Sequence, residues 1–181
     1  MSFCNCSLTK VTIPNSVTSI EGYAFQGCNN LTNIVIPSST TNINSNAFDE
    51  CNNLLSFTVD SNNANYSSIN GSLFSKDGTA LIRVPCGMSN VTIPNTTTNI
   101  GNRAFYGCTN ITNMKIPDNV TSIETYAFYN CSGLIAVSIG SGVTNIKDNT
   151  FASCSSLTVI SMNGNITNIG AGAFHSCGSL T

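Results

Sequence analysis

The chain of 181 residues carries very little charge. Six residues are Lys or Arg and eight are Asp or Glu, together 8% of the sequence, whereas about a quarter of the residues of a typical soluble domain are charged. Binding to nucleic acid or to an anionic membrane surface depends on clusters of Lys and Arg that neutralise several phosphates. With a net charge of −2 and no basic cluster, we expect no nucleic-acid partner and no attachment to anionic membranes.

The groups that carry catalysis are also scarce. The single histidine, His175, precedes Ser176 and Cys177. A nucleophile needs a base, and the base needs a third group that orients it, which these three neighbours do not supply. The sequence has no glycine-rich loop with a lysine that could hold a phosphate. We therefore expect no enzymatic activity and no cofactor.

Long apolar segments are absent as well. No run of about 18 apolar residues occurs, so we expect no membrane insertion in this segment. The first ten residues, MSFCNCSLTK, lack the basic start and the apolar stretch of a secretory signal. What the chain has instead is 27 asparagines, which lie singly or in pairs and, with Ser and Thr, predict a neutral polar surface.

A repeat dominates the sequence. Phenylalanine recurs with a period of 23, apart from one shorter step of 22 and one longer step of 57, and a cysteine follows each of these phenylalanines at the third position. A fixed period of roughly 20 to 29 residues is typical of a solenoid, in which each unit buries its apolar face only by stacking on its neighbours. The phenylalanines are Phe3, Phe25, Phe48, Phe105, Phe128, Phe151 and Phe174.

Two apolar stripes in each repeat predict strands. The first is an apolar-x-apolar triplet, at 11–13, 34–36, 114–116 and 137–139, which has the period of two expected of a strand with one buried face. Proline often follows the triplet and would end the strand, because it has no N–H to donate. The second stripe is an Ile that precedes Ala-Phe and predicts a second short strand followed by a single helical turn. One strand per coil, stacked in register, gives a parallel sheet.

The unit C-x-x-L-T-x-I-x-I-P-x-x-V-T-x-I-x-x-x-A-F resembles the BspA-like class of leucine-rich repeats. It is visible in CNNLTNIVIPSSTTNINSNAF (28–48) and CTNITNMKIPDNVTSIETYAF (108–128), and the match covers nearly the whole chain. The resemblance implies a leucine-rich-repeat right-handed coil, mostly β, with a parallel sheet and short helical or 3-10 turns. We expect residues 1–181 to form one repeat solenoid of about eight coils, and a fragment without caps, because both ends stop inside a repeat.

Residues 60–90 interrupt the repeat. Residues 69–74 fit the Ile and Ala-Phe positions of a degenerate coil, and residues 81–85 fit the start of the next strand. Asp77-Gly78, flanked by apolar residues, predicts a hairpin turn between them. The segment is either a structural variant of the coil, of a kind that BspA-like proteins contain, or a protruding hairpin that contacts a partner through Lys76, Asp77 and Gly78.

The nine cysteines could be metal ligands, disulfides or apolar filler. Zinc sites need cysteines two to four residues apart with further ligands nearby, whereas most of these lie singly and 23 apart, so we expect no metal. Stacking places equivalent residues about 4.8 Å apart, where a disulfide is conceivable, but a ladder holds the side chains parallel and the total is odd. Since reduced cysteine acts as a small buried apolar residue, we expect a structural core ladder of reduced Cys28, Cys51, Cys108, Cys131, Cys154 and Cys177.

Variable residues on a constant frame are where a solenoid would recognise a partner. On the strands these are the outward positions, each of which taken alone is more simply explained as solvated. As a set they have little charge and no aromatic anchor, so we expect weak, multivalent binding of proteins. The candidates are Lys10, Thr12, Asn33, Val35, Ser56, Thr58, Asn113, Lys115, Ala136, Ser138, Val159 and Ser161.

The resemblance also implies a function. It points to a cell-surface or secreted adhesin-like protein of a microbe or parasite, which binds host extracellular-matrix proteins or other cells. The alternative is a cytoplasmic scaffold for protein–protein interactions, because reduced cysteines persist more readily in a reducing compartment. The open coils at both ends also lead us to expect end-to-end association of copies.

Overall fold

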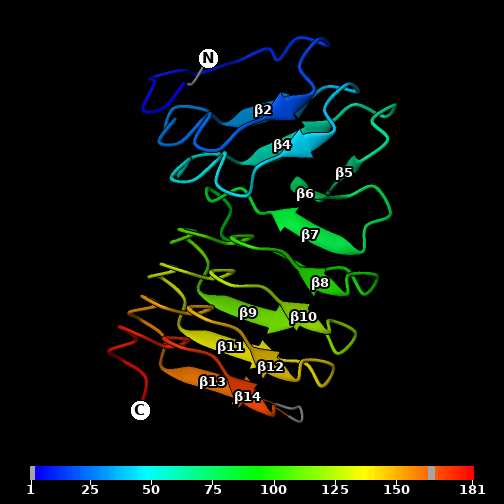
Figure 1. Cartoon of the computed structure of the whole chain (residues 1–181). Coiled ribbons are helices and arrows are strands. Elements are labelled where there is room, and N and C mark those ends of the chain that lie inside the picture. Colours follow the sequence, from blue (N-terminus) through cyan, green and yellow to red (C-terminus); the bar gives the residue numbers. More distant parts are fainter. Residues whose placement is uncertain (1–2, 163–165) are drawn as a thin grey trace.

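The computed structural model describes residues 3–162 and 166–181, which form one stack of coils (Figure 1). The N-terminus lies at one end of the stack and the C-terminus at the other, so the order of the coils in space follows the sequence. Strands of successive regular coils pair in parallel with an offset of one period, as Ala136 does with Val159. The chain is therefore a β-solenoid, and the predicted fold class is confirmed.

The strands fall into three sets. Four-residue strands of the regular coils pair as β2–β4 and as β9–β11–β13: β2 (Asn33–Ile36), β4 (Ser56–Val59), β9 (Asn113–Ile116), β11 (Ala136–Ile139) and β13 (Val159–Met162). Two-residue strands carry the second stripe: β1 (Ser19–Ile20), β3 (Asn42–Ile43), β8 (Asn99–Ile100), β10 (Ser122–Ile123), β12 (Asn145–Ile146) and β14 (Asn168–Ile169). The third set is a meander in the irregular segment: β5 (Tyr66–Ile69), β6 (Ser72–Ser75) and β7 (Ala80–Arg83).

Alternation within the four-residue strands fixes which side chains build the core. In β9, Met114 and Ile116 are buried while Asn113 and Lys115 are exposed. This follows from the pleat, which sends successive side chains to opposite faces. The expected strand at 11–13 is wrong, because these residues form no ladder with β2.

The expected helical turn ahead of Ala-Phe is also wrong, since residues 3–162 and 166–181 contain no helix. In the coil of Phe128 the chain makes single turns instead, and two of its residues, Tyr126 (φ 59°) and Asn130 (φ 55°), are left-handed. A right-handed helix needs consecutive residues in the right-handed region, so each reversal stops it. The same pair of reversals recurs at Tyr23 and Gly27, Arg103 and Gly107, Asn149 and Ser153, and Gly172 and Ser176.

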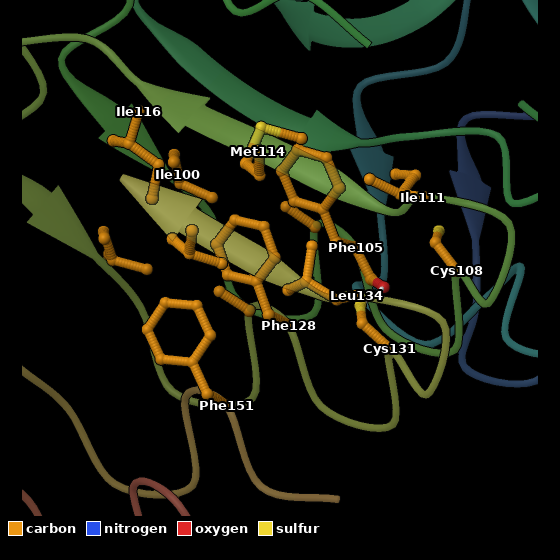
Figure 2. Close-up of a cluster of buried hydrophobic side chains, with 14 of the residues drawn as sticks. Ile100, Phe105, Cys108, Ile111, Met114, Ile116, Phe128, Cys131, Leu134 and Phe151 are labelled. Atoms are coloured by element: carbon orange, nitrogen blue, oxygen red, sulfur yellow. Dashed lines mark hydrogen bonds between the residues drawn. The ribbon is translucent and has the colours of Figure 1, made fainter. Parts of the chain in front are cut away.

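The phenylalanines of the repeat stack on one another inside the solenoid. Figure 2 shows Phe105, Phe128 and Phe151 in a row beside Met114 and Ile116. The ring centroids of Phe105 and Phe128 lie 4.4 Å apart and those of Phe128 and Phe151 lie 5.0 Å apart, in nearly parallel planes. Each ring therefore covers the next, which extends the core from coil to coil.

The cysteine ladder runs alongside this stack. The Cys131 thiol donates a hydrogen bond to the carbonyl oxygen of Phe105 at 3.0 Å, and Cys154 does the same to Phe128 at 3.1 Å. Each thiol thus satisfies a carbonyl of the preceding coil while its sulfur fills the corner. Equivalent bonds are made by Cys28, Cys51 and Cys177, although Cys177 is partly exposed.

The irregular segment divides the solenoid into two cores. β5 and β6 pair antiparallel through a turn at Asn70 and Gly71 (φ 51° and 80°), and β6 and β7 pair antiparallel through the turn predicted at Asp77-Gly78. β7 then pairs in parallel with β8, which joins the meander to the regular coils. The core of the earlier coils ends at Leu73, and that of the later coils begins at Phe74.

Residues 81–85 do not start a strand of the regular kind, which corrects the expectation. The backbone N–H of Val84 donates to the carbonyl of Ala104 at 2.8 Å, the bond that Phe25 makes to Ala47 at 2.9 Å in a regular coil. Val84 therefore occupies the phenylalanine position. Arg83 consequently stands at the position of the alanine, which is fully buried in the regular coils, for example at Ala104.

Burial of the thiols predicts a loss of stability in alkali. Burial raises the pKa of Cys51 from its ordinary value of 9.0 to about 11. The unfolded chain loses this proton first, so the free energy of unfolding should fall as the pH rises from 9 to about 11, by about 2 to 3 kcal/mol for this thiol. Urea unfolding at each pH measures the fall. Cys51→Ala should make the fall smaller but not abolish it, because burial also raises the pKa of Cys131. An equal fall in that variant would contradict the assignment.

Candidate functional site

The strand face is the outward surface formed by the twelve candidate residues. Nine of them are exposed, and Ser56, Ala136 and Ser138 are half-buried. The ladders align them into columns: Asn33 beside Ser56 and Val35 beside Thr58 in the first group; Asn113, Ala136 and Val159 in one column of the second group and Lys115, Ser138 and Ser161 in the other. Lys10 and Thr12 are exposed but belong to no ladder.

The strand face is polar with a few apolar points. Asn33 donates from Nδ2 to Ser56 Oγ at 3.0 Å, so neighbouring coils are linked by side chains across the surface. Val35 and Val159 are 49% and 56% exposed. With hydroxyl and amide groups beside small apolar patches, this surface can contact a protein over several coils.

Sequence reasoning missed two exposed apolar residues at the edge of this surface. Leu55 and Ile135 directly precede β4 and β11 and are 54% and 45% exposed. The signal was available, because threonine holds the equivalent positions of the neighbouring coils, at 32, 112 and 158. An apolar residue at a position where the repeat otherwise places threonine is a candidate contact.

Hydrogen bonds hold the loop of Lys76, Asp77 and Gly78 against the rest of the chain. The Asp77 carboxylate accepts hydrogen bonds from Ser75 Oγ at 2.6 Å and from the backbone N–H of Thr79 at 3.0 Å, and these bonds lower its pKa. Lys76 Nζ donates to the carbonyl of Ser61 at 3.1 Å, and Gly78 (φ 71°) is buried. With β6 also buried, the segment has the geometry of a structural variant of the coil and not of a protruding hairpin.

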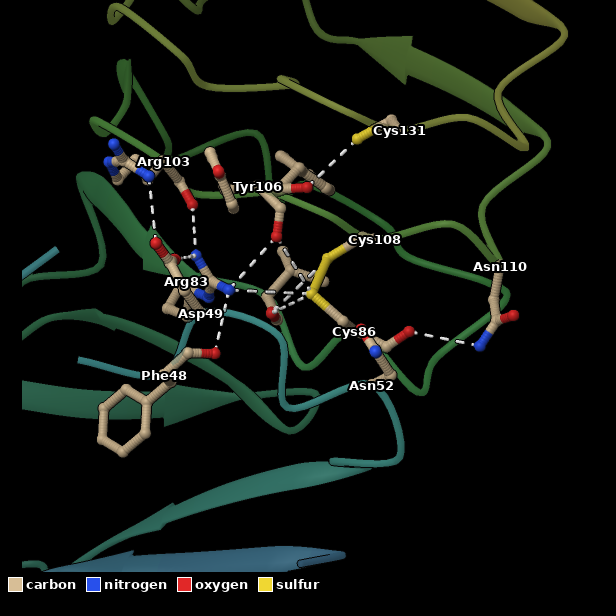
Figure 3. Close-up of a disulfide and its surroundings, with 12 residues drawn as sticks. Phe48, Asp49, Asn52, Arg83, Cys86, Arg103, Tyr106, Cys108, Asn110 and Cys131 are labelled. Carbon is tan, nitrogen blue, oxygen red and sulfur yellow. Dashed lines mark hydrogen bonds and ion pairs between the residues drawn. A yellow bond between two sulfur atoms is a disulfide. The ribbon is translucent and has the colours of Figure 1, made fainter. Parts of the chain in front are cut away.

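A buried ion network crosses the boundary between the two cores (Figure 3). Asp49 accepts from the Arg83 guanidinium at 3.0 Å and from the Arg103 guanidinium at 2.9 Å. Arg83 also donates to the carbonyls of Phe48 (3.0 Å) and Tyr106 (3.2 Å). The side chain of Asp49 is only 3% exposed. The network links the coil before the meander to β7 of the meander and to the coil of Arg103 that follows it.

Burial opposes both charges of this pair. It raises the pKa of Asp49 above the usual range of a carboxyl group, and the two guanidinium groups oppose that shift. Burial likewise lowers the pKa of Arg83, and Asp49 opposes the change. Each charge is therefore maintained by its partner, so removal of one group leaves the other exposed to the full cost of desolvation.

One disulfide, Cys86–Cys108, corrects the expectation of a wholly reduced ladder. The two Cα atoms lie 4.3 Å apart, in adjacent coils. Val84 and Cys86 are separated by one residue, whereas Phe and Cys of the regular coils are separated by two, so the sulfur of Cys86 is displaced along the ladder toward Cys108. The separation of 22 between these two cysteines does not reveal the bond, because Cys6 and Cys28 are also 22 residues apart and are both free.

Groups for catalysis do not come together in the described residues. His175 is exposed, and no cluster of three or more His, Cys, Asp or Glu side chains within residues 3–162 and 166–181 could hold a metal ion. The same residues contain no helix of the length and hydropathy that a bilayer crossing requires. The strand face is the candidate site that the described residues form.

Comparisons with known proteins agree with the fold. A family model described as "BspA type Leucine rich repeat region" matches in six copies over residues 1–85 and 83–181. A leucine-rich cell surface protein of Faecalibacterium prausnitzii is 38% identical over 93% of this chain, with a TM-score of 0.82, and the chain spans 45% of that protein. The pneumococcal vaccine antigen PcpA is 24% identical over 84% of this chain, with a TM-score of 0.77 and 38% of its own length covered, which shows the fold alone.

A leucine-rich-repeat protein of Treponema pallidum, TpLRR, shares the fold in the same way, at 23% identity and a TM-score of 0.58, over 91% of this chain and 72% of that one. No curated protein matches the chain. The family match extends from end to end. The repeated residues of the sequence form the parallel ladders, the phenylalanine stack and the cysteine ladder of the structure. The chain belongs to the BspA-type leucine-rich repeat family.

Proposed function

We propose that the chain is a non-enzymatic, protein-binding segment of a cell-surface or secreted adhesin-like protein, which attaches to host matrix proteins or cells through the strand face. The observation that carries this proposal is the set of exposed columns on β2–β4 and β9–β11–β13, where rigid strands display side chains that differ from coil to coil. Contacts repeated over several coils would combine weak sites into useful affinity.

The location at the cell surface has separate support. The Cys86–Cys108 disulfide is a bond that persists in oxidising, extracellular surroundings and is rare in the cytosol. The similarity to the F. prausnitzii cell surface protein points the same way. The alternative, a cytoplasmic scaffold, is favoured by the seven cysteines outside the disulfide. Mass mapping of unreduced protein from its native source separates the two, since loss of the 86–108 linkage would favour the scaffold.

Substitution on the strand face should weaken binding. Val159→Glu buries a charge in any interface formed there, so we expect about tenfold weaker binding to those members of a panel of immobilised matrix proteins and host cells that the parent chain binds. Asn145→Glu is the control, because Asn145 lies on β12, off the strand face, and is exposed. No binding to any member, or equal loss in both variants, would contradict the proposal.

End-to-end association of copies is proposed on a different observation. A cavity of about 650 Å³ opens in the first described coil between apolar side chains that include Phe3, Ile13 and Ile20. Ile169 in the last coil is exposed, although its equivalent Ile146 is buried beneath the next coil. Docking one on the other would be a heterologous contact that builds filaments. Light scattering should show mass rising with concentration, and a strict monomer at high concentration would count against it.

A further inference from the structure

The sheet β9–β11–β13 has an open edge. β9 pairs with β11 and with no other strand of the described residues. The repeat places 91–94 beside it, since 91 and 93 are the equivalents of Met114 and Ile116 one period earlier in the chain. In regular coils the N–H groups of Ile135 and Ala136 both donate to the carbonyl of Thr112, but no backbone hydrogen bond of the described chain joins 89–94 to β9.

The groups left open on this edge belong to residues of the strand face. In the parallel ladder, Ala136 directs its N–H toward β9, and Met114 and Ile116 are the β9 residues whose N–H groups point back to β11. The N–H and C=O groups of Asn113 and Lys115 therefore point away from β11, toward 91–94. An unpaired row of this kind is a template for another extended chain.

A bounded slot lies along the edge. The cavity there has a volume of about 530 Å³ and is lined by Val91, Thr92, Ile93, Asn95, Lys115, Pro117 and Asp118. That volume falls within the roughly 300 to 1,000 Å³ of ligand-binding clefts. Amide side chains bridge the two coils at both ends of the slot: Asn110 Nδ2 donates to the carbonyl of Cys86 at 3.2 Å, and Asn119 Nδ2 donates to that of Thr97 at 2.6 Å. The coils are thus joined by side chains on either side of β9, and the cavity between them reaches β9 at Lys115.

One cation and one anion line the slot, Lys115 and Asp118. Asp118 accepts hydrogen bonds from the N–H and Oγ of Ser141 at 2.8 and 3.1 Å, so its carboxylate is engaged on the next coil. Lys115 is exposed and takes part in none of the three ion pairs found among the described residues, although its charge contributes to lowering the pKa of Asp118. A carboxylate on an incoming chain would lie next to this ammonium group, while its alternate side chains would face the apolar floor formed by Val91 and Ile93.

We propose that the slot receives a short extended segment of a partner protein, with an acidic side chain beside Lys115, which adds to β9 as a further strand of the β9–β11–β13 sheet. This proposal rests on the proposed function, that the strand face binds proteins, and it names strand addition as the mode of binding. Main-chain hydrogen bonds supply attachment in such strand addition, and the alternate side chains supply selectivity. Because β9 has four residues, the paired segment is limited to about four residues, or about 13 Å.

The test uses a labelled peptide, acetyl-Ser-Val-Glu-Val-Ser-amide, and fluorescence anisotropy on the full chain. We expect binding with a Kd below about 1 mM and slower hydrogen exchange at the amides of Asn113 and Lys115. N-methylation of one alternate set of peptide residues should weaken binding at least tenfold, and methylation of the other set should weaken it less. Lys115→Glu should weaken it about fivefold. Asn145→Glu adds a carboxylate on β12, off the strand face, and should have no effect.

Absence of peptide binding, or binding that neither N-methylation nor Lys115→Glu alters, would overturn the slot proposal. The panel assay with Val159→Glu is independent of this result. If matrix proteins or cells bind through Val159 and the peptide does not bind, the slot is wrong and the proposed function stands. If the peptide binds at Asn113 and Lys115 and no matrix protein or cell binds, the slot is supported and the adhesin function fails.

Discussion

Asp49→Ala should destabilise the solenoid by about 3 to 5 kcal/mol, the range found when one partner of a buried ion pair is removed. The variant leaves the Arg83 guanidinium buried, with carbonyl oxygens as its remaining acceptors. It also removes the link from Arg103 to the coil that precedes the meander. Urea unfolding followed by circular dichroism measures the change in the free energy of unfolding.

Two further variants show whether the loss of stability comes from the ion network. Glu50→Ala removes the exposed acidic neighbour and should change stability by no more than about 0.5 kcal/mol. The double variant Asp49→Ala with Arg83→Met removes both central charges and should recover part of the loss, because apolar replacement of a buried ion pair is often neutral or stabilising. If Asp49→Ala alone costs less than about 1 kcal/mol, the network does not hold the two cores together.

Phe128→Ala should be comparably damaging, at about 3 to 5 kcal/mol, since truncation of a buried aromatic residue removes its contacts and leaves a cavity. Phe128 stacks on Phe105 on one side and on Phe151 on the other, so a gap there interrupts the row. In a solenoid each coil contacts only its neighbours, so the loss should fall on the two adjoining interfaces. Hydrogen exchange should show loss of protection centred on β9 and β11.

The matched control is Tyr129→Ala, one residue along the chain. Tyr129 stacks on Tyr106 at 5.1 Å on the outside of the coil and is half-exposed. An exposed aromatic pair contributes about 0.5 to 1.5 kcal/mol, so this variant should retain most of the stability. Equal effects of Phe128→Ala and Tyr129→Ala would show that the inner stack is not the principal source of stability.

The regular coils were predictable because the residues that recur with the period of the repeat are the residues that are buried. The constant spacing of Phe105, Phe128 and Phe151 and the alternation in 114–116 require parallel strands with one buried face, and the ladders have that register. The left-handed reversals were not predictable. Tyr126 and Arg103 are not residues that favour positive φ, and they adopt it because the coils on either side hold the turn in place.

The candidate site was predictable only in part. The outward positions of β9 and β11 follow from strand alternation, and the exposed columns lie where expected. The open edge of β9 could not be inferred, because Val91-Thr92-Ile93 fits the strand pattern as well as 114–116 does. Whether two matching triplets pair depends on the geometry of the coils that carry them, and the coil of Val91 includes the shortened step from Val84 to Cys86.

The sequence by itself determined a charge-poor solenoid with a phenylalanine stack and a cysteine ladder, because a repeat copies the same local preferences into every coil. The tertiary structure alone decided the exceptions: that Arg83 at an alanine position meets Asp49, 34 residues away, that Cys86 bonds to Cys108, and that β9 keeps an open edge. Each exception arises where the period fails, and there a residue's neighbours are set by the path of the chain in space and not by its place in the repeat.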